Sequence, residues 1–172
     1  LATVRAGATL LYDSDPHDEE EETRIKASAF LEATLGNKKN ISVVSEIAQT
    51  GIGKKILFVD NEDSFVHTLA SYVRQTGAKV VTLRSGFPYE MFVEIDPDLL
   101  FISPGPGIPT DQDVPKLVGR AINMGIPIFG VCLGHQGIAE HFGAKLRILE
   151  HPVHGKPDKI FHNSESFFSK LD

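Results

Sequence analysis

The sequence predicts an α/β fold, with a largely parallel β-sheet and helices on both of its faces, over residues 54–150. The first observation behind this prediction is that short apolar runs alternate with longer segments that carry apolar residues at helical spacing. The second is that a glycine closes each of two predicted helices, at Gly77 and Gly125. The third is that polar or glycine-rich loops follow three of the apolar runs, where ligands of parallel sheets bind.

Each strand is predicted from an apolar run that is bounded by polar or turn-forming residues. The strands are expected at residues 56–60, 79–83, 98–103, 126–131 and 144–149. The helices are predicted from apolar residues at helical spacing, which in the first of them are Phe65, Leu69, Tyr72 and Val73. The helices are expected at residues 64–76, 113–124 and 135–142.

Composition limits the classes of function. The chain of 172 residues can bury one core, and its net charge of −6 with scattered Lys and Arg indicates no nucleic-acid or membrane surface. No apolar stretch is long enough to span a bilayer, and the single cysteine excludes an internal disulfide. These features favour a protein of the reducing cytoplasm. Both ends, Leu1 and Asp172, are expected to be cuts within a longer protein.

The segment around the single cysteine, Cys132, carries the strongest functional signal. An apolar run leads into Gly-Val-Cys-Leu-Gly at residues 130–134, and a helix-compatible stretch follows. This order matches the nucleophile elbow of hydrolases, in which a Cβ on either side of the nucleophile would clash with neighbouring backbone. The sulfur is expected at the positive end of a helix, where the reactive thiolate is favoured. A buried core cysteine is the alternative, and the glycines and the following His-Gln pair argue against it.

A second loop, Ser-Pro-Gly-Pro-Gly at residues 103–107, directly follows a predicted strand. Its composition favours a rigid backbone with exposed N–H groups, although a plain Pro-Gly turn has the same composition. Beside a cysteine elbow, one of these donors could form an oxyanion hole together with the N–H of Leu133. That arrangement suits acyl transfer through a thioester.

Two N-terminal segments are predicted to be separate from the α/β domain. Residues 1–12 are expected to form a strand or two, and residues 19–33 a helix. Because one strand and one helix cannot bury a core, residues 1–33 are interpreted as the remnant of a larger domain. Polar and glycine-rich breaks mark residues 34–53 as a linker.

Three motifs follow one another along the chain, at residues 58–65 (Phe-Val-Asp-Asn-Glu-Asp-Ser-Phe), 103–107 and 130–136. Together they make residues 54–172 resemble class I, triad-type glutamine amidotransferases, and in particular the amidotransferase component of anthranilate synthase. The resemblance implies a flavodoxin-like core and glutamine hydrolysis at Cys132, with ammonia passed to a synthase partner. It also implies that the N–H groups of Gly105 and Leu133 form the oxyanion hole, and that Gln136 helps to hold glutamine.

The N-terminal segment carries a second resemblance. Residues 4–8, 13–16 and 19–27 are similar to the extreme C-terminus of chorismate-utilising synthases, which have an α+β domain. In that family two glutamates bind Mg²⁺, and they match Glu19 and Glu22, which lie on one face of the predicted helix. Ala6 and Gly7 match backbone contacts to chorismate. Without the resemblance, a solvated acidic helix start is the better explanation of Glu19 and Glu22.

The two resemblances together imply a fused anthranilate synthase, a lyase that converts chorismate and glutamine to anthranilate on the route to tryptophan. Its partners would be glutamine, chorismate and the remainder of the synthase domain in the same chain, and homodimerisation stays open. A fused synthase that makes aminodeoxychorismate or a phenazine precursor is the closest alternative. The others are a non-catalytic binding module and, from the sheet pattern alone, a cysteine hydrolase or nucleotide binder, although residues 60–63 would repel a phosphate.

The catalytic base of the family is a histidine in a His-Pro-Glu motif downstream of the cysteine, and these residues contain no such motif. His151-Pro152 is followed by Val153. His135 lies one turn beyond Cys132 on the same predicted helix, so its ring is not expected to face the sulfur. The chain is therefore predicted to be inactive by itself, and to be marginally stable with exposed apolar sheet surface.

Overall fold

The computed structural model describes residues 48–150, together with Pro16, His17, Glu20, Thr23, Arg24, Lys159, 161–163, Glu165 and Ser169. The chain divides into two units, of which one is Val44–Arg147 and the other joins Leu1–Val43 with Ile148–Asp172. In the second unit, the described residues between 16 and 24 are helical. The strand predicted at residues 1–12 lies outside the described residues, as does most of the helix predicted at 19–33.

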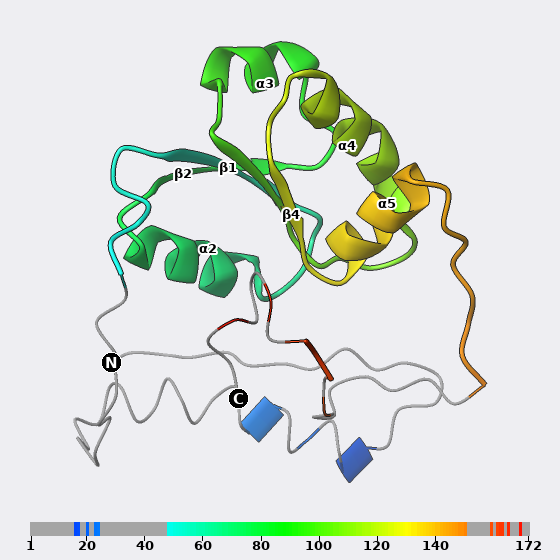
Figure 1. Cartoon of the computed structure of the whole chain (residues 1–172). Helices are drawn as coiled ribbons and strands as arrows, with labels where there is room; N and C mark the ends of the chain where they lie inside the picture. Colours follow the sequence, from blue (N-terminus) through cyan, green and yellow to red (C-terminus); the bar gives the residue numbers. More distant parts are fainter. Residues whose placement is uncertain are drawn as a thin grey trace, which may run out of the picture. The chain divides into compact units, whose positions relative to one another are not determined.

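Four parallel strands form the sheet of the Val44–Arg147 unit, and their order is β2-β1-β3-β4 (Figure 1). Their bounds are Lys55–Asp60 for β1, Lys79–Arg84 for β2, Leu99–Ile102 for β3 and Ile128–Gly130 for β4. The predicted α/β fold with a parallel sheet is confirmed, as are the first four predicted strands. Because the chain crosses from β2 over β1 to β3, the strand order reverses between β1 and β3, where α/β sheets commonly bind ligands.

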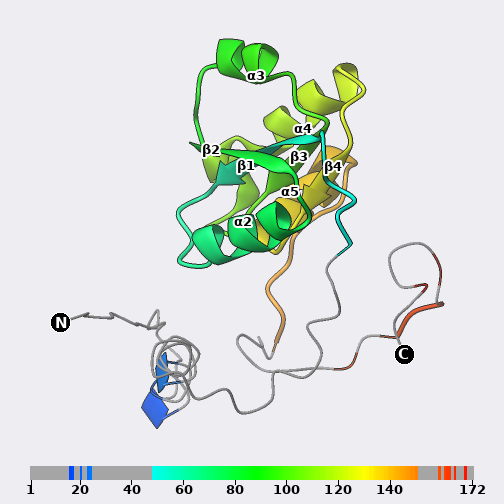
Figure 2. The same ribbon diagram turned by 90° about the vertical axis from the view of Figure 1, so that its left-hand side faces the viewer.

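Helices cover both faces of this sheet. One face is covered by α2 (Val66–Gln75), and the other by α3 (Tyr89–Ile95), α4 (Val114–Asn123) and α5 (Leu133–His141). Figure 2 shows α2 on the opposite side of the strands from α3 and α4. A short 3-10 helix, η1 (Pro109–Gln112), precedes α4. No helix in the described ranges is both long and apolar enough to cross a membrane.

Strand β1 forms the centre of the core because both of its faces are buried. Leu57 and Val59 belong to the apolar cluster under α3, α4 and α5, and Ile56 and Phe58 belong to the cluster under α2. The continuous apolar run of β1 is typical of a central parallel strand that is covered on both sides. Phe58 stacks on Phe101 of the neighbouring strand β3, with ring centroids 4.5 Å apart.

Helix α3 is absent from the sequence prediction. Phe92 is the buried residue of its seven-residue span, so the segment lacks the apolar repeat that identifies a longer helix. The Phe92 ring lies between two other aromatic rings, with centroids 6.5 Å from Phe87 and 6.3 Å from Tyr89. The packing of Phe92 and the partly buried Ile95 against the core, rather than a repeat long enough to recognise, therefore explains this helix.

The strand predicted at residues 144–149 is wrong. These residues have no regular secondary structure and are exposed, and the exposed fraction of Ile148 reaches 94%. An extended segment forms a strand only where a neighbouring strand pairs with its N–H and C=O groups, and β4 has no second partner in the described part of the chain. The preceding helix, predicted to start at His135, begins instead at Leu133.

Asp98, directly before β3, ties the starts of β1 and β3 together. Its carboxylate accepts hydrogen bonds from the backbone N–H of Lys55 at 2.8 Å and from Lys54 Nζ at 3.0 Å. The Lys55 amide, followed by the Lys54 ammonium, lowers the pKa of Asp98 below its ordinary value. The ionised carboxylate therefore stabilises the folded state.

We expect Asp98→Asn to lower the free energy of unfolding at neutral pH and to have a smaller effect in acid. The pKa of Asp98 is lower in the folded chain than in the unfolded chain. Its contribution is therefore complete above the unfolded pKa and is lost as the pH falls through the folded pKa. Urea unfolding of both proteins across that range measures the difference, with Glu94→Gln as a control that removes an exposed carboxylate. A difference that does not change with pH would contradict this assignment.

Candidate active site

Cys132 lies in the tight turn between β4 and α5, where it is the N-cap residue of α5. Its backbone has φ 51° and ψ −108°, a conformation that residues with a Cβ rarely adopt. The side chain is exposed and accessible to a substrate. A strained residue on a sharp strand-to-helix turn is the geometry of a nucleophile elbow, as the sequence predicts.

The two glycines that flank Cys132 permit the close packing of this turn. A Cβ built on Gly130 would lie 2.5 Å from the carbonyl carbon of Gly134 and 2.6 Å from the nitrogen of His135. A Cβ built on Gly134 would collide with the carbonyl oxygen of Ile102 and lie 2.9 Å from its Cβ. Because most of these contacts are to backbone atoms, a change of side-chain rotamer cannot relieve them. The expected need for glycine on both sides of the cysteine is confirmed.

The loop after β3 lies against the start of α5. A Cβ built on Gly105 would lie 2.9 Å from Leu133 Cδ2 and 2.5 Å from the carbonyl oxygen of Asn61. The fold thus brings together Gly105 and Leu133, the residues whose N–H groups are predicted to form an oxyanion hole. Gln136 follows in the first turn of α5, where its backbone N–H donates to the carbonyl oxygen of Cys132 at 2.9 Å. The chemical roles of these residues stay predictions.

A pair of buried polar residues, Asn61 and Ser103, joins the loops that follow β1 and β3. Ser103 Oγ accepts the backbone N–H of Asn61 at 2.9 Å and donates to the carbonyl oxygen of Pro104 at 2.6 Å. Asn61 Nδ2 donates to the carbonyl oxygen of Ser103 at 2.9 Å. Both side chains are fully buried, so these hydrogen bonds hold the loop that carries Gly105 in a fixed position relative to β1.

Sequence reasoning identified both loops but missed the roles of Asn61 and Ser103. One signal in the sequence could have identified them, because each is a short polar residue at the end of an apolar run. Asn61 follows the run at residues 56–60, and Ser103 is the last residue of the run at 98–103. Asn61 Oδ1 is also buried and has no hydrogen-bond partner within the described residues. An unpaired buried acceptor costs about 1–3 kcal/mol, and such groups are uncommon in folded proteins.

Two histidines of α5, His135 and His141, make no hydrogen bond to Cys132. His135 is exposed in the first turn of α5, and no hydrogen bond joins its ring to the sulfur. His141, at the end of α5, has Nδ1 3.0 Å from the carbonyl oxygen of Pro115, and its ring fills the space beside Gly119. His141 therefore joins α5 to α4 and has a structural role.

The other predicted site residues lie outside the described part of the chain. These are the chorismate contacts Ala6 and Gly7 and the metal ligands Glu19 and Glu22. Within the described residues, no group of three or more His, Cys, Asp or Glu side chains is arranged to hold a metal ion. The chorismate and Mg²⁺ sites therefore stay predictions.

Known proteins that are similar to this chain include glutamine amidotransferases and anthranilate synthases. A family model described as "Glutamine amidotransferase class-I" matches residues 57–172. The chain is 50% identical over 161 residues to an anthranilate synthase of Azospirillum brasilense, a match that covers 93% of this chain and 22% of that protein. It is 38% identical over 117 residues to the aminodeoxychorismate/anthranilate synthase component 2 of Bacillus subtilis (strain 168), and this match covers 67% of this chain and 60% of that protein.

A solved structure supports the same fold. A putative GMP synthase protein from Thermoplasma acidophilum superposes with a TM-score of 0.59 at 28% sequence identity, and the match covers 69% of this chain and 60% of that one. The chain thus spans 22% of the Azospirillum relative and 60% of the Bacillus relative. Each of these two relatives is longer than the part that this chain matches.

We expect Gly134→Ala to destabilise the fold, because the new Cβ would collide with the backbone of Ile102. Such overpacking costs about 2–3 kcal/mol, measured as a loss in the free energy of unfolding in urea. Gly125→Ala is the matched control, because its built Cβ meets nothing within 4 Å and only its φ of +69° opposes alanine. That strain costs about 1 kcal/mol. Equal losses in the two variants would contradict the packing argument.

Proposed function

The chain belongs to the class-I glutamine amidotransferase family, and we propose that it is part of an anthranilate synthase that releases ammonia from glutamine at Cys132. The observation that carries this proposal is the strained turn at Cys132, which lies beside Gly105 and Leu133. An accessible thiol next to backbone hydrogen-bond donors is the arrangement that acyl transfer needs.

The proposed reaction begins when the Cys132 sulfur attacks the carboxamide carbon of glutamine. The carbonyl electrons move onto oxygen, and the N–H groups of Gly105 and Leu133 stabilise the resulting oxyanion. The carbon–nitrogen bond then breaks, and the nitrogen takes up a proton and leaves as ammonia. Water hydrolyses the thioester that remains, which yields glutamate and restores Cys132. Gln136 would help to hold the substrate.

We further propose that the chain is part of a fused synthase, with residues 1–33 from a chorismate-utilising domain, 34–53 as linker and 54–172 from the amidotransferase domain. The length of the Azospirillum match supports the occurrence of these segments together in one chain. That match covers 161 of the 172 residues, so it runs through residues 34–53 into the segments on both sides. The ammonia would then be used within the same chain, in the cytoplasm, to convert chorismate to anthranilate and pyruvate.

The chorismate-utilising part of the proposal rests on four residues of the N-terminal segment. Ala6 and Gly7 would contact chorismate through their backbone. Glu19 and Glu22 would contribute carboxylate oxygens to a Mg²⁺ ion, since hard divalent cations prefer oxygen ligands. The ion would supply positive charge for the carboxylates of chorismate.

Two alternatives have specific support. The name of the Bacillus relative combines aminodeoxychorismate with anthranilate synthase, so similarity in the amidotransferase part does not separate these two products. A non-catalytic binding module is the alternative of a different class, because within the described residues of the Val44–Arg147 unit no histidine is hydrogen-bonded to Cys132. Reactivity of Cys132 toward a glutamine analogue discriminates between an enzyme and such a module.

We expect the glutamine analogue diazo-oxonorleucine to alkylate the chain once, at Cys132, because this is its only thiol and the side chain is exposed. Intact mass and peptide mapping measure the label, and excess glutamine should slow the reaction. Cys132→Ser is the negative control, and iodoacetamide reports accessibility alone. Labelling by iodoacetamide but not by the glutamine analogue would favour the binding module.

We expect these 172 residues alone to release no more glutamate from glutamine than their Cys132→Ala variant does. The reason is that the sequence contains no His-Pro-Glu motif, and that neither His135 nor His141 is hydrogen-bonded to Cys132. A coupled glutamate dehydrogenase assay measures the product. Turnover that depends on Cys132 would show that a general base lies within these residues, and the prediction of inactivity would be wrong.

A further inference from the structure

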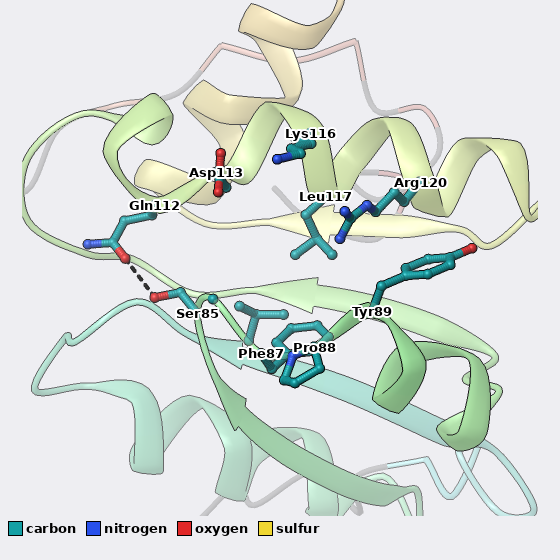
Figure 3. Close-up of a pocket in the computed structure, with 11 residues that line it drawn as sticks. Ser85, Phe87, Pro88, Tyr89, Gln112, Asp113, Lys116, Leu117 and Arg120 are labelled. Atoms are coloured by element: carbon teal, nitrogen blue, oxygen red, sulfur yellow. Dashed lines mark hydrogen bonds between the residues drawn. The ribbon is translucent and has the colours of Figure 1, made fainter.

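A cavity of about 290 Å³ lies between the β2–α3 turn and α4 (Figure 3). Turn residues 85–89 form one wall, and Gln112, Lys116 and Arg120 form the opposite wall. Val59 of β1 contributes from the sheet. None of the residues assigned to glutamine hydrolysis lines this cavity, so it is a separate feature of the fold.

The wall formed by α4 carries two cations. Lys116 and Arg120 are four positions apart, which places both on the same face of the helix. The Arg120 guanidinium lies 4.8 Å from the centroid of the Tyr89 ring across the cavity. Neither cation makes an ion pair within the described residues, and Asp113 is the acidic residue of the lining. The cavity therefore has an excess of positive charge.

Neutral hydrogen-bond donors lie on the wall that the turn forms. Ser85 Oγ donates to Gln112 Oε1 at 2.6 Å, a bond that joins the two walls (Figure 3). The backbone N–H groups of Gly86 and Phe87 donate to no acceptor in the described part of the chain. Because the backbone N–H of Ser85 donates to the carbonyl oxygen of Asp60 at 2.9 Å, the turn is anchored to β1. The donors are thus held in place before any ligand arrives.

We propose that this cavity binds a small metabolite through a phosphate group. Lys116 and Arg120, with Asp113 also in the lining, leave one net positive charge that attracts a phosphate monoester, and the backbone N–H groups of Gly86 and Phe87 lie on the facing turn. Phe87, Pro88 and Leu117 supply apolar surface for a short carbon skeleton. The volume of about 290 Å³ suits a compact ligand, since it lies at the lower end of the range for small-molecule sites.

The test is calorimetric titration of the 172-residue chain with glycerol phosphate at low ionic strength. Succinate is the comparison dianion, because a dicarboxylate would use the same donors, and sodium chloride controls for ionic strength. We expect saturable one-to-one binding of the phosphate ester and weaker binding of succinate. The double variant Lys116→Gln/Arg120→Gln should bind at least about tenfold more weakly, since each lost charge removes a charge-assisted hydrogen bond.

Arg74→Gln/Lys79→Gln is the matched control, because it removes two exposed cations outside the cavity and changes the net charge equally. It should bind as the parent does. Circular dichroism checks folding, and Lys116→Gln alone replaces the double variant if that variant unfolds. No saturable binding, tighter binding of succinate, or equal losses in both double variants would overturn the proposal. Labelling of Cys132 should not depend on these cations, so it tests the amidotransferase proposal separately.

Discussion

The close approach of α5 to its neighbours is the constraint on which the rest of the site depends. A Cβ on Gly134 would collide with Ile102 of β3, and a Cβ on Gly137 would collide with Val114 of α4. Helix α5 can begin directly at the end of β4 only because these positions lack side chains. The short connection leaves Cys132 with a φ of 51°, so the backbone strain at Cys132 is a consequence of this packing.

The site also requires that the loops after β1 and β3 keep fixed positions relative to each other. Asn61 and Ser103 provide this through buried hydrogen bonds between the loops after β1 and β3. Gly105 then fits between Asn61 and Leu133 without space for a Cβ. Because both polar side chains are excluded from water, their hydrogen bonds are not exchanged for solvent, which keeps the loop that carries Gly105 rigid.

Helix α4 connects the elbow with the cationic cavity. On one side it contacts α5 through Pro115 and Gly119, which receive the ring of His141. On another side it presents Lys116 and Arg120 to the cavity. A ligand in the cavity would therefore contact the same helix that supports the helix of Cys132. The fold places two chemically distinct sites on a shared rigid element.

The sequence by itself determined the four strands, the helices α2, α4 and α5, and the elbow at Cys132, because apolar repeats and flanking glycines act over a few neighbouring residues. Only the tertiary structure decided the features that depend on contacts between residues distant in the chain. Helix α3 forms around one buried ring, Phe92, and the segment at 144–149 stays irregular because no described strand pairs with it. Asn61 and Ser103 are 42 positions apart, and the cavity joins two loops and a helix, so no local pattern encodes either one.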